Sequence, residues 1–258
     1  MDPLDEKVGI LRRWIRECPR NGLVFLGGAG VSTESGIPDF RSPNGLYGRP
    51  YEYPYPPERM ISRSFFDAHP EEFFDFYVDR MLFTEAEPND AHEALAKLER
   101  EGKLSAVITQ NIDGLHQEAG SVNVLELHGS VWRNECMDCG KAYGLDELRS
   151  AHASSEDGIP RCISCNGIIK PDVVLYEEPL DGSVLQAAVS VVASAEMMIV
   201  AGTSLAVYPA AGLLDYFRGS HLVIINMSPT PQDRHADLCI EGKVGEVLRR
   251  ALQGTDAS

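Results

Sequence analysis

The chain has 258 residues, 43% of them apolar, which is enough for one α/β domain with a large core and a small insertion. Its formal net charge of −16 disfavours direct binding to nucleic acid and favours cationic partners such as lysine-rich peptides. The most apolar stretch, residues 189–207, is interrupted by Glu196 and Gly202, and the first ten residues are polar and acidic, so we expect neither a membrane span nor a signal peptide.

Five short apolar runs predict buried strands. Each is bounded by glycine or a polar turn and several are rich in β-branched residues, as is typical of parallel sheets. The runs are residues 22–27, 104–109, 122–127, 197–202 and 221–226. Residues 89–102 have apolar residues at helical spacing and end on Gly102. This alternation predicts an α/β fold, a doubly wound parallel sheet with helices on both faces.

The segment after the first strand, "GGAGVSTES" at residues 27–35, matches two places of the dinucleotide-binding fingerprint Gly-x-Gly-x-x-Gly. Gly28 and Gly30 are present, but Thr33 takes the third place. Such a loop can place backbone N–H groups and a helix N-terminus against a pyrophosphate. Three interpretations are open here: a damaged loop for hydride transfer, a coincidence, or a loop built for another reaction.

Two segments depart from the α/β alternation. Residues 42–87 are rich in Tyr, Pro and Phe and predict a loop-and-helix insertion, and residues 134–169 contain four of the six cysteines. We therefore expect three parts: a nucleotide-binding domain made of residues 1–43, 88–133 and 170–258, a helical insertion at 44–87, and a metal-ribbon module at 134–169.

The four cysteines of that module form two Cys-x-x-Cys pairs with 22 residues between them. This spacing is typical of one tetrahedral metal site, with zinc as the usual metal and iron as an alternative. Disulfides are the competing interpretation, which an intracellular protein disfavours. Because four thiolates close the coordination shell, we expect a structural metal bound by Cys136, Cys139, Cys162 and Cys165. Cys18 and Cys239 have no partner in the sequence, and we expect them in the core.

Polar or glycine residues follow the carboxyl ends of all five predicted strands, where open α/β sheets bind ligands. Residues 110–113 place two amides and a carboxylate after the second strand, a set suited to a carboxamide and a ribose. His128 follows the third strand and is a candidate general base. Its rival, His116, lies in a predicted helix, where orienting a neighbour or packing is the expected role. A polar turn explains each strand end alone, but five together predict a nucleotide cleft.

These stretches resemble the sirtuins, NAD-dependent protein-lysine deacylases, and in particular their short bacterial and archaeal type. The resemblance covers residues 5–250. Its motifs are "GAGVSTESGIPDFRS" (28–42), "TQNIDGLH" (109–116), "LHG" (127–129), the paired cysteines, "KPDVVLYEE" (170–178), "GTSLAVYPAA" (202–211) and "IN" (225–226). It implies a Rossmann-like NAD-binding domain with a zinc ribbon and a helical insertion, one structural zinc ion, and NAD consumed as a co-substrate. We expect a cytoplasmic monomer acting on acyl-lysine proteins or peptides.

The resemblance also implies roles for single residues. His128 would be the general base and Asn111 a second catalytic residue. Val174, Leu175 and Tyr176 would pair as a strand with the substrate peptide, and residues 37–49 would form a mobile loop over NAD. The expected NAD contacts are Ala29, Thr33, Phe40, Arg41, Gln110, Asn111, Ile112, Asp113, His128, Thr203, Ser204, Asn226 and Val244.

The implied chemistry is not redox. The acyl oxygen would attack C1′ of the nicotinamide ribose and expel nicotinamide, and His128 would take a proton from a ribose hydroxyl. The products would be deacetylated lysine, nicotinamide and O-acetyl-ADP-ribose. Alternatives are a preference for succinyl-type or longer acyl groups and a mono-ADP-ribosyltransferase side activity. Two competing functions belong to other classes: an NAD-dependent dehydrogenase and a non-catalytic zinc-ribbon module.

The chain departs from the family's pattern in the peptide-pairing motif, which usually ends aromatic-Gly-Glu. Here Glu177 takes the place of the glycine, and Leu175 replaces a common aromatic residue. The loss of glycine restricts the local backbone. The added negative charge predicts a preference for basic residues beside the acyl-lysine.

A second feature concerns the acyl group. Tyr77 and Arg80 have the Tyr-x-x-Arg spacing that deacylases for acidic acyl groups carry in the helical insertion. Counted back from "EPNDAH", the pair lies one residue out of register. We therefore expect a packed tyrosine and a solvent-facing arginine.

Overall fold

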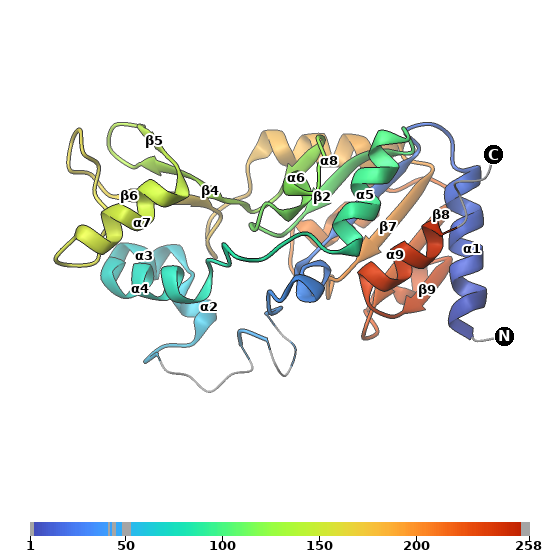
Figure 1. The fold of residues 1–258 in the computed structure, drawn as a ribbon, viewed down its shortest axis with the longest axis horizontal. Helices are drawn as coiled ribbons and strands as arrows, with labels where there is room; N and C mark the ends of the chain where they lie inside the picture. Colours follow the sequence, from blue (N-terminus) through green and yellow to red (C-terminus); the bar gives the residue numbers. More distant parts are fainter. Residues whose placement is uncertain (1–2, 41, 43–44, 48–52, 254–258) are drawn as a thin grey trace.

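The computed structural model describes residues 3–40, 42, 45–47 and 53–253. Figure 1 shows a large lobe built on a parallel sheet and a small lobe beside it. The chain leaves the large lobe twice, first for three short helices and then for a second sheet that carries the cysteines. These two excursions together make the small lobe. The residue boundaries predicted for the three parts stay a prediction.

The large sheet has six parallel strands in the order β3-β2-β1-β7-β8-β9. Their bounds are β1 Leu23–Gly27, β2 Leu104–Thr109, β3 Val124–Glu126, β7 Met197–Ala201, β8 His221–Asn226 and β9 Leu238–Glu241. The five predicted strands and the doubly wound fold are confirmed. Strand β9 was not predicted, because this short edge strand alternates buried and more exposed residues and is not an uninterrupted apolar run.

Helices cover both faces of this sheet (Figure 1). Alternate residues of β1 face opposite sides: Phe25 belongs to one core cluster, and Val24 and Leu26 belong to another. The first cluster includes α1 Pro3–Glu17, α5 Asp90–Arg100 and α9 Val244–Leu252. The second includes α8 Gly182–Ser194 and the 3₁₀ helix η3 Ala210–Tyr216. Within the described residues, no helix combines the length and the apolar character needed to cross a membrane.

The predicted helix at residues 89–102 is confirmed as α5. The side chain of Asn89 caps it by accepting a hydrogen bond from the N–H of Ala91 at 2.9 Å, and the ring of His92 accepts one from the N–H of Asn89. Gly102 follows the helix with a φ of +69°, a left-handed conformation that suits a glycine at this position. The chain then enters β2 directly.

The small lobe has one aromatic-rich core shared by both excursions. Its helices are α2 Pro57–Met60, α3 Arg63–Ala68, α4 Pro70–Arg80 and α7 Leu145–Ser154. Its antiparallel sheet has the order β5-β4-β6, with bounds β4 Gly129–Cys136, β5 Ala142–Tyr143 and β6 Ile169–Val173. Phe73 and Phe74 of α4 and Ile169 of β6 are buried in the same cluster, so the helical insertion and the cysteine module pack as one body.

Candidate active site

A cavity of about 700 Å³ lies beyond the carboxyl ends of the large sheet and extends to the small lobe. The loops after β1, β2, β7 and β8 line one side of it, and α4 and the segment after β6 line the other. Strands β1 and β7 are the neighbours at which the strand order reverses. Open α/β sheets bind ligands at this switch point, and the volume suits a small-molecule site.

The loop after β1 corrects one expectation. In place of a helix N-terminus it forms two 3₁₀ turns, η1 Ala29–Val31 and η2 Thr33–Ser35, and Gly36 ends them with a φ of +86°. The hydroxyl of Thr33 donates to the carbonyl of Gly30 at 2.9 Å, a local bond that competes with helix formation. The third glycine of the fingerprint serves close packing of a helix on its strand. Because no α-helix follows here, a threonine fits that place.

Gly28 and Gly30 are needed for packing between two loops. A Cβ on Gly30 would lie 2.6 Å from the Cα of Gly202, and a Cβ on Gly28 would lie 2.8 Å from the Cβ of Thr203. The N–H of Gly30 donates to the carbonyl of Gly202 at 2.8 Å. The loops after β1 and β7 are therefore held together across the switch point.

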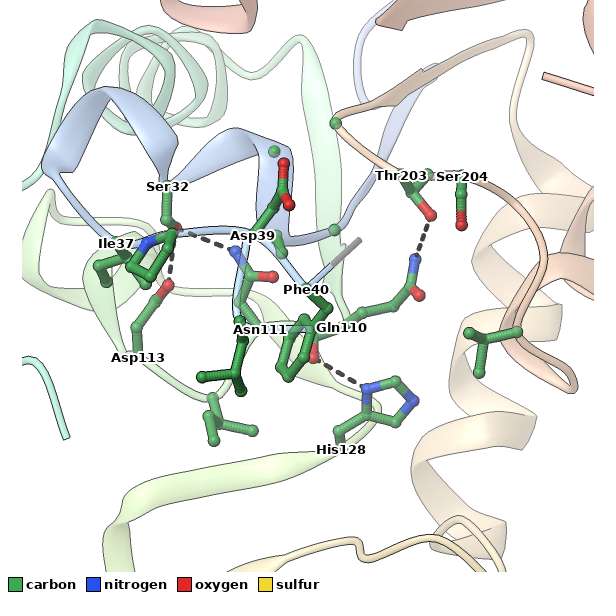
Figure 2. A pocket seen from close by; sticks show the side chains of 18 of the residues that line it. Ser32, Ile37, Asp39, Phe40, Gln110, Asn111, Asp113, His128, Thr203 and Ser204 are labelled. Carbon is green, nitrogen blue, oxygen red and sulfur yellow. Dashed lines mark hydrogen bonds between the residues drawn. The ribbon is translucent and has the colours of Figure 1, made fainter. Parts of the chain in front are cut away.

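Ser32, Asn111 and Asp113 form a hydrogen-bonded group on one side of the cavity (Figure 2). The hydroxyl of Ser32 donates to Asp113 Oδ2 at 2.7 Å and accepts from Asn111 Nδ2 at 3.0 Å. The carbonyl of Asp113 accepts from the indole N–H of Trp132 at 2.8 Å. No role was predicted for Ser32 from the sequence. Its partners lie far away in the chain, so no local pattern could have indicated this link.

On another side of the cavity, three polar side chains join the ends of β2, β7 and β8. The amide of Gln110 donates to Thr203 Oγ1 at 3.1 Å (Figure 2). The amide of Asn226 accepts from the N–H of Thr203 at 3.1 Å and donates to its carbonyl at 2.9 Å. These bonds give the loop that carries Thr203 and Ser204 a defined place at the cavity wall.

The half-buried ring of His128 points into the cavity from the turn between β3 and β4 (Figure 2). Its Nδ1 lies 2.9 Å from the carbonyl oxygen of Gln110. A carbonyl oxygen can only accept, so Nδ1 carries the hydrogen and Nε2 keeps its lone pair. Burial lowers the pKa of His128, although the hydrogen bond to Gln110 opposes this shift. The imidazole is therefore neutral at neutral pH, as a general base must be.

The rival His116 lies on α6, Leu115–Glu118, and is not among the residues that line the cavity. It is 1% exposed and packs against His92 and Phe25. Burial lowers the pKa of His116 to about 3 and that of His92 to about 4. Of the two roles expected for His116, orienting or packing, its burial and ring contacts support packing.

The segment after β6 runs along the cavity beside His128. The N–H of Val174 donates to the carbonyl of His128 at 3.0 Å. Tyr176 pairs with the connection between α2 and α3: its N–H donates to Ile61 and its carbonyl accepts from the N–H of Arg63, both at 3.0 Å. Some of the main-chain groups of residues 174–176, which were predicted to pair with the substrate peptide, are thus already paired within the protein.

Tyr77 and Arg80 of α4 also line the cavity. Tyr77 is 1% exposed and stacks on Phe73, as expected for a packed tyrosine. Arg80 is only partly solvent-facing, with 28% of its side chain exposed and an ion pair to Asp79 at 2.7 Å. The hydroxyl of Tyr77 is buried and has no hydrogen-bond partner among the described residues.

The four cysteines of the paired motifs converge at one end of the small lobe, and their sulfurs all lie within 4.8 Å of one another. The Sγ atoms of Cys136 and Cys165 are 3.4 Å apart, and those of Cys139 and Cys162 are 3.6 Å apart. A tetrahedral zinc ion with bonds of about 2.3 Å separates its sulfurs by about 3.8 Å. The cluster therefore fits zinc. The hydroxyl of Tyr143 donates to Cys162 Sγ at 3.0 Å and orients it.

The cavity brings together all the predicted NAD and peptide residues that the structure describes. Arg41 lies outside the described residues, as do parts of the loop predicted at 37–49. The predicted residues found in the cavity lining are Ala29, Thr33, Phe40, Gln110, Asn111, Ile112, Asp113, His128, Val174, Leu175, Tyr176, Thr203, Ser204, Asn226 and Val244.

The fold and the site define a nucleotide-binding α/β protein with a four-cysteine module and a strand-like segment beside a neutral histidine. Residues 28–209 match the model of the Sir2 family. The chain is 54% identical over 247 residues to the NAD-dependent protein deacetylase of Clostridium acetobutylicum, covering 96% of this chain and 98% of that protein. It is 53% identical over 250 residues to the protein of the same description from Clostridium perfringens, covering 96% and 100%. The chain belongs to the Sir2 family.

Solved structures agree with this assignment. A Sir2 variant with a deacetylated peptide and 3′-O-acetyl-ADP-ribose has a TM-score of 0.87 at 41% identity, covering 96% of this chain and 98% of that one. A Sir2 protein with a peptide and NAD⁺ has a TM-score of 0.83 at 41% identity, covering 93% and 95%.

Proposed function

We propose that this protein is an NAD-dependent protein-lysine deacetylase that releases nicotinamide and forms O-acetyl-ADP-ribose. The position of His128 carries the proposal. Its proton-accepting Nε2 lies in a cavity whose one side has the loops of a nucleotide site and whose other side has a strand-like segment. A base between these two sides can act on a nucleotide ribose while an acyl-lysine enters beside it.

Different polar groups around His128 would contact different parts of the nucleotide. Asn111 and Asp113, held by Ser32, line the nicotinamide pocket with Ile112. Gln110 contacts the ribose. The adenosine half would lie against Thr203, Ser204, Asn226 and Val244, and the rest of the nucleotide would contact Ala29, Thr33 and Phe40, all of which line the cavity.

His128 has a single chemical task in this scheme. NAD supplies a ribosyl carbon from which nicotinamide can leave. Nε2 of His128 accepts the proton of a ribose hydroxyl, and the Gln110 carbonyl stabilises the charge that the ring then carries at Nδ1. Asn111 positions the reacting ribose through its amide, which Ser32 holds in place.

Zinc has a structural task. The four thiolates leave no open coordination position, so the metal holds the two cysteine turns together and takes no part in the chemistry. The small lobe contributes α4, Val173 and the segment after Val173 to the cavity, so the metal acts on catalysis through the positions of these elements.

A second candidate function concerns the acyl group. The buried hydroxyl of Tyr77 has no hydrogen-bond partner among the described residues, and Tyr77 and Arg80 line the cavity from the same helix, which favours acyl groups with a polar end. The test is a panel of acetyl, propionyl, succinyl and longer acyl peptides. A kcat/KM highest for acetyl-lysine supports the deacetylase, and one highest for succinyl-lysine supports this second function.

The favoured peptides have basic residues beside the acyl-lysine. The net charge is −16, and the carboxylate of Glu177 has no cationic partner in the described part of the chain. Glu178 contributes less, because Lys170 and Arg63 neutralise it. We also propose that the protein is cytoplasmic and monomeric and that it does not bind nucleic acid directly. Sedimentation of the protein with and without DNA tests the oligomeric state and the binding of nucleic acid.

Incubation with NAD and an acetyl-lysine peptide tests the proposal. Nicotinamide and deacetylated peptide formed in equal amounts support it. Absorbance from NADH would favour a dehydrogenase, and the absence of any product would favour a non-catalytic zinc-ribbon module. Label from NAD that becomes attached to protein would reveal a mono-ADP-ribosyltransferase side activity.

A further inference from the structure

Glu177 has an unusual backbone conformation. Its φ of +76° lies in the left-handed region, which side chains with a Cβ rarely adopt. Only four non-glycine residues of the described chain have a positive φ, and two of them are asparagines, which tolerate this region. A glutamate here needs other contacts to hold it.

The side chain of Glu177 provides those contacts. Its Oε2 accepts a hydrogen bond from the N–H of Ser64 at 2.8 Å, and its Oε1 accepts one from the hydroxyl of Ser64 at 3.0 Å. Ser64 belongs to α3 of the small lobe, more than a hundred residues away in the chain. One carboxylate thus makes two bonds to one residue and closes the turn of residues 174–178 onto α3.

The neighbours of Glu177 are fixed as well. Tyr176 pairs with Ile61 and Arg63, and the carboxylate of Glu178 binds Arg63, Lys170 and the N–H of Leu175. The N–H of Val174 donates to His128, and the N–H of Glu178 donates to the carbonyl of Leu175 at 3.0 Å, so four of the five main-chain N–H groups of residues 174–178 are engaged. In the described chain, the N–H of Glu177 alone among the five makes no hydrogen bond.

We propose that Glu177 is a positioning residue for the peptide substrate. Its carboxylate makes two hydrogen bonds to Ser64, which we call the clasp. The clasp holds the turn at residues 174–178 in the conformation in which an extended peptide can pair beside His128. This inference rests on the proposed deacetylase function. It predicts that the clasp acts on peptide affinity and leaves the NAD site unaffected, because none of its bonds reaches the loops after β1, β7 or β8.

Steady-state kinetics of four variants test the role. Glu177→Ala keeps the unfavourable backbone and loses both bonds, so the peptide KM should rise about tenfold with kcat and the NAD KM unchanged. Glu177→Gln keeps one oxygen to accept from the N–H of Ser64, and its NH2 group can donate to the Ser64 hydroxyl, so it should restore most of the affinity. Ser64→Ala should raise the peptide KM by a smaller factor. Glu58→Ala is the matched control, since exposed Glu58 on α2 makes no hydrogen bond or ion pair in the described chain.

Glu177→Gly separates the side chain from the backbone, because glycine adopts a positive φ freely. A wild-type peptide KM in this variant would overturn the proposal, since the conformation alone would then suffice. Equal rises of the peptide and NAD KM in Glu177→Ala would also overturn it.

Hydrogen exchange of the ligand-free protein tests the clasp without reference to catalysis. Glu177→Ala should speed exchange in residues 174–178 and leave β7 unchanged. Unchanged exchange in residues 174–178 would contradict the clasp. If the wild type fails to deacetylate although Glu177→Ala speeds exchange, the proposed function falls, and with it the role of Glu177 in peptide binding.

Discussion

At the scale of single residues, His128 is the most sensitive position. Replacement by alanine removes the base and should lower kcat by a factor of about 10² to 10⁴, because proton transfer then falls to water. The thermal midpoint should stay close to that of the wild type. His235→Ala is the matched control, because His235 is exposed and is not among the residues that line the cavity. Substantial kcat in His128→Ala would mean that another group is the base.

The buried His116 makes a prediction about stability. The pKa of His116 is about 3 in the folded protein, against about 6.5 in an unfolded chain. Below pH 6.5 only the unfolded state takes up the proton, so folded stability decreases as the pH falls. Between pH 7.5 and 5.5 this amounts to about 1.4 kcal/mol. In His116→Leu, the free energy of unfolding measured with urea should fall less between pH 7.5 and 5.5 than in the wild type. The difference should be the amount given above. An equal decrease in both proteins would contradict the account.

Residue chemistry was predictable where a motif is local. The strand-end position of His128 and the spacing of the four cysteines were enough to single them out. Contacts between distant segments were not. Ser32 was overlooked because its partners Asn111 and Asp113 come from another loop. The glycine missing at Glu177 was visible in the sequence, but the bond to Ser64 that accompanies it requires the fold.

At the scale of elements, the cysteine module makes the clearest prediction. Cys139→Ala removes one of four ligands, so the protein should lose its single zinc ion, and its thermal midpoint should fall because the turns of β4 and β6 lose their link. Metal analysis and thermal unfolding measure both effects. Cys239→Ala, outside the cluster, is the control. One zinc ion per chain in Cys139→Ala would contradict the assignment of the ligands.

Element prediction succeeded for long apolar runs and failed where short-range contacts decide. Strands β2 and β8 have the predicted bounds because uninterrupted apolar runs leave little choice. The loop after β1 was expected to start a helix, but it forms 3₁₀ turns because Thr33 bonds the backbone and Gly36 ends the turn. Edge strand β9 has only two buried residues. Neither the 3₁₀ turns nor β9 is long enough to show a recognisable period of apolar residues in the sequence.

At the scale of the whole molecule, the net charge of −16 should act on substrate capture. The KM of an acetyl-lysine peptide with basic flanks should rise as salt increases, because screening weakens attraction over distances of about 10 Å at 0.1 M. The same peptide with its flanking Lys and Arg replaced by Ala should have a higher KM at low salt and little salt dependence. Equal KM values for the two peptides at low salt would contradict a preference for basic flanks.

The central claim is that the two sides of the cavity combine NAD and an acyl-lysine in one reaction. Mass spectrometry of the products made from NAD and an acetyl-lysine peptide tests it most directly. We expect nicotinamide, deacetylated peptide and O-acetyl-ADP-ribose in equal amounts, with the acetyl group on the ribose. Free acetate as the initial product together with unconsumed NAD would contradict it.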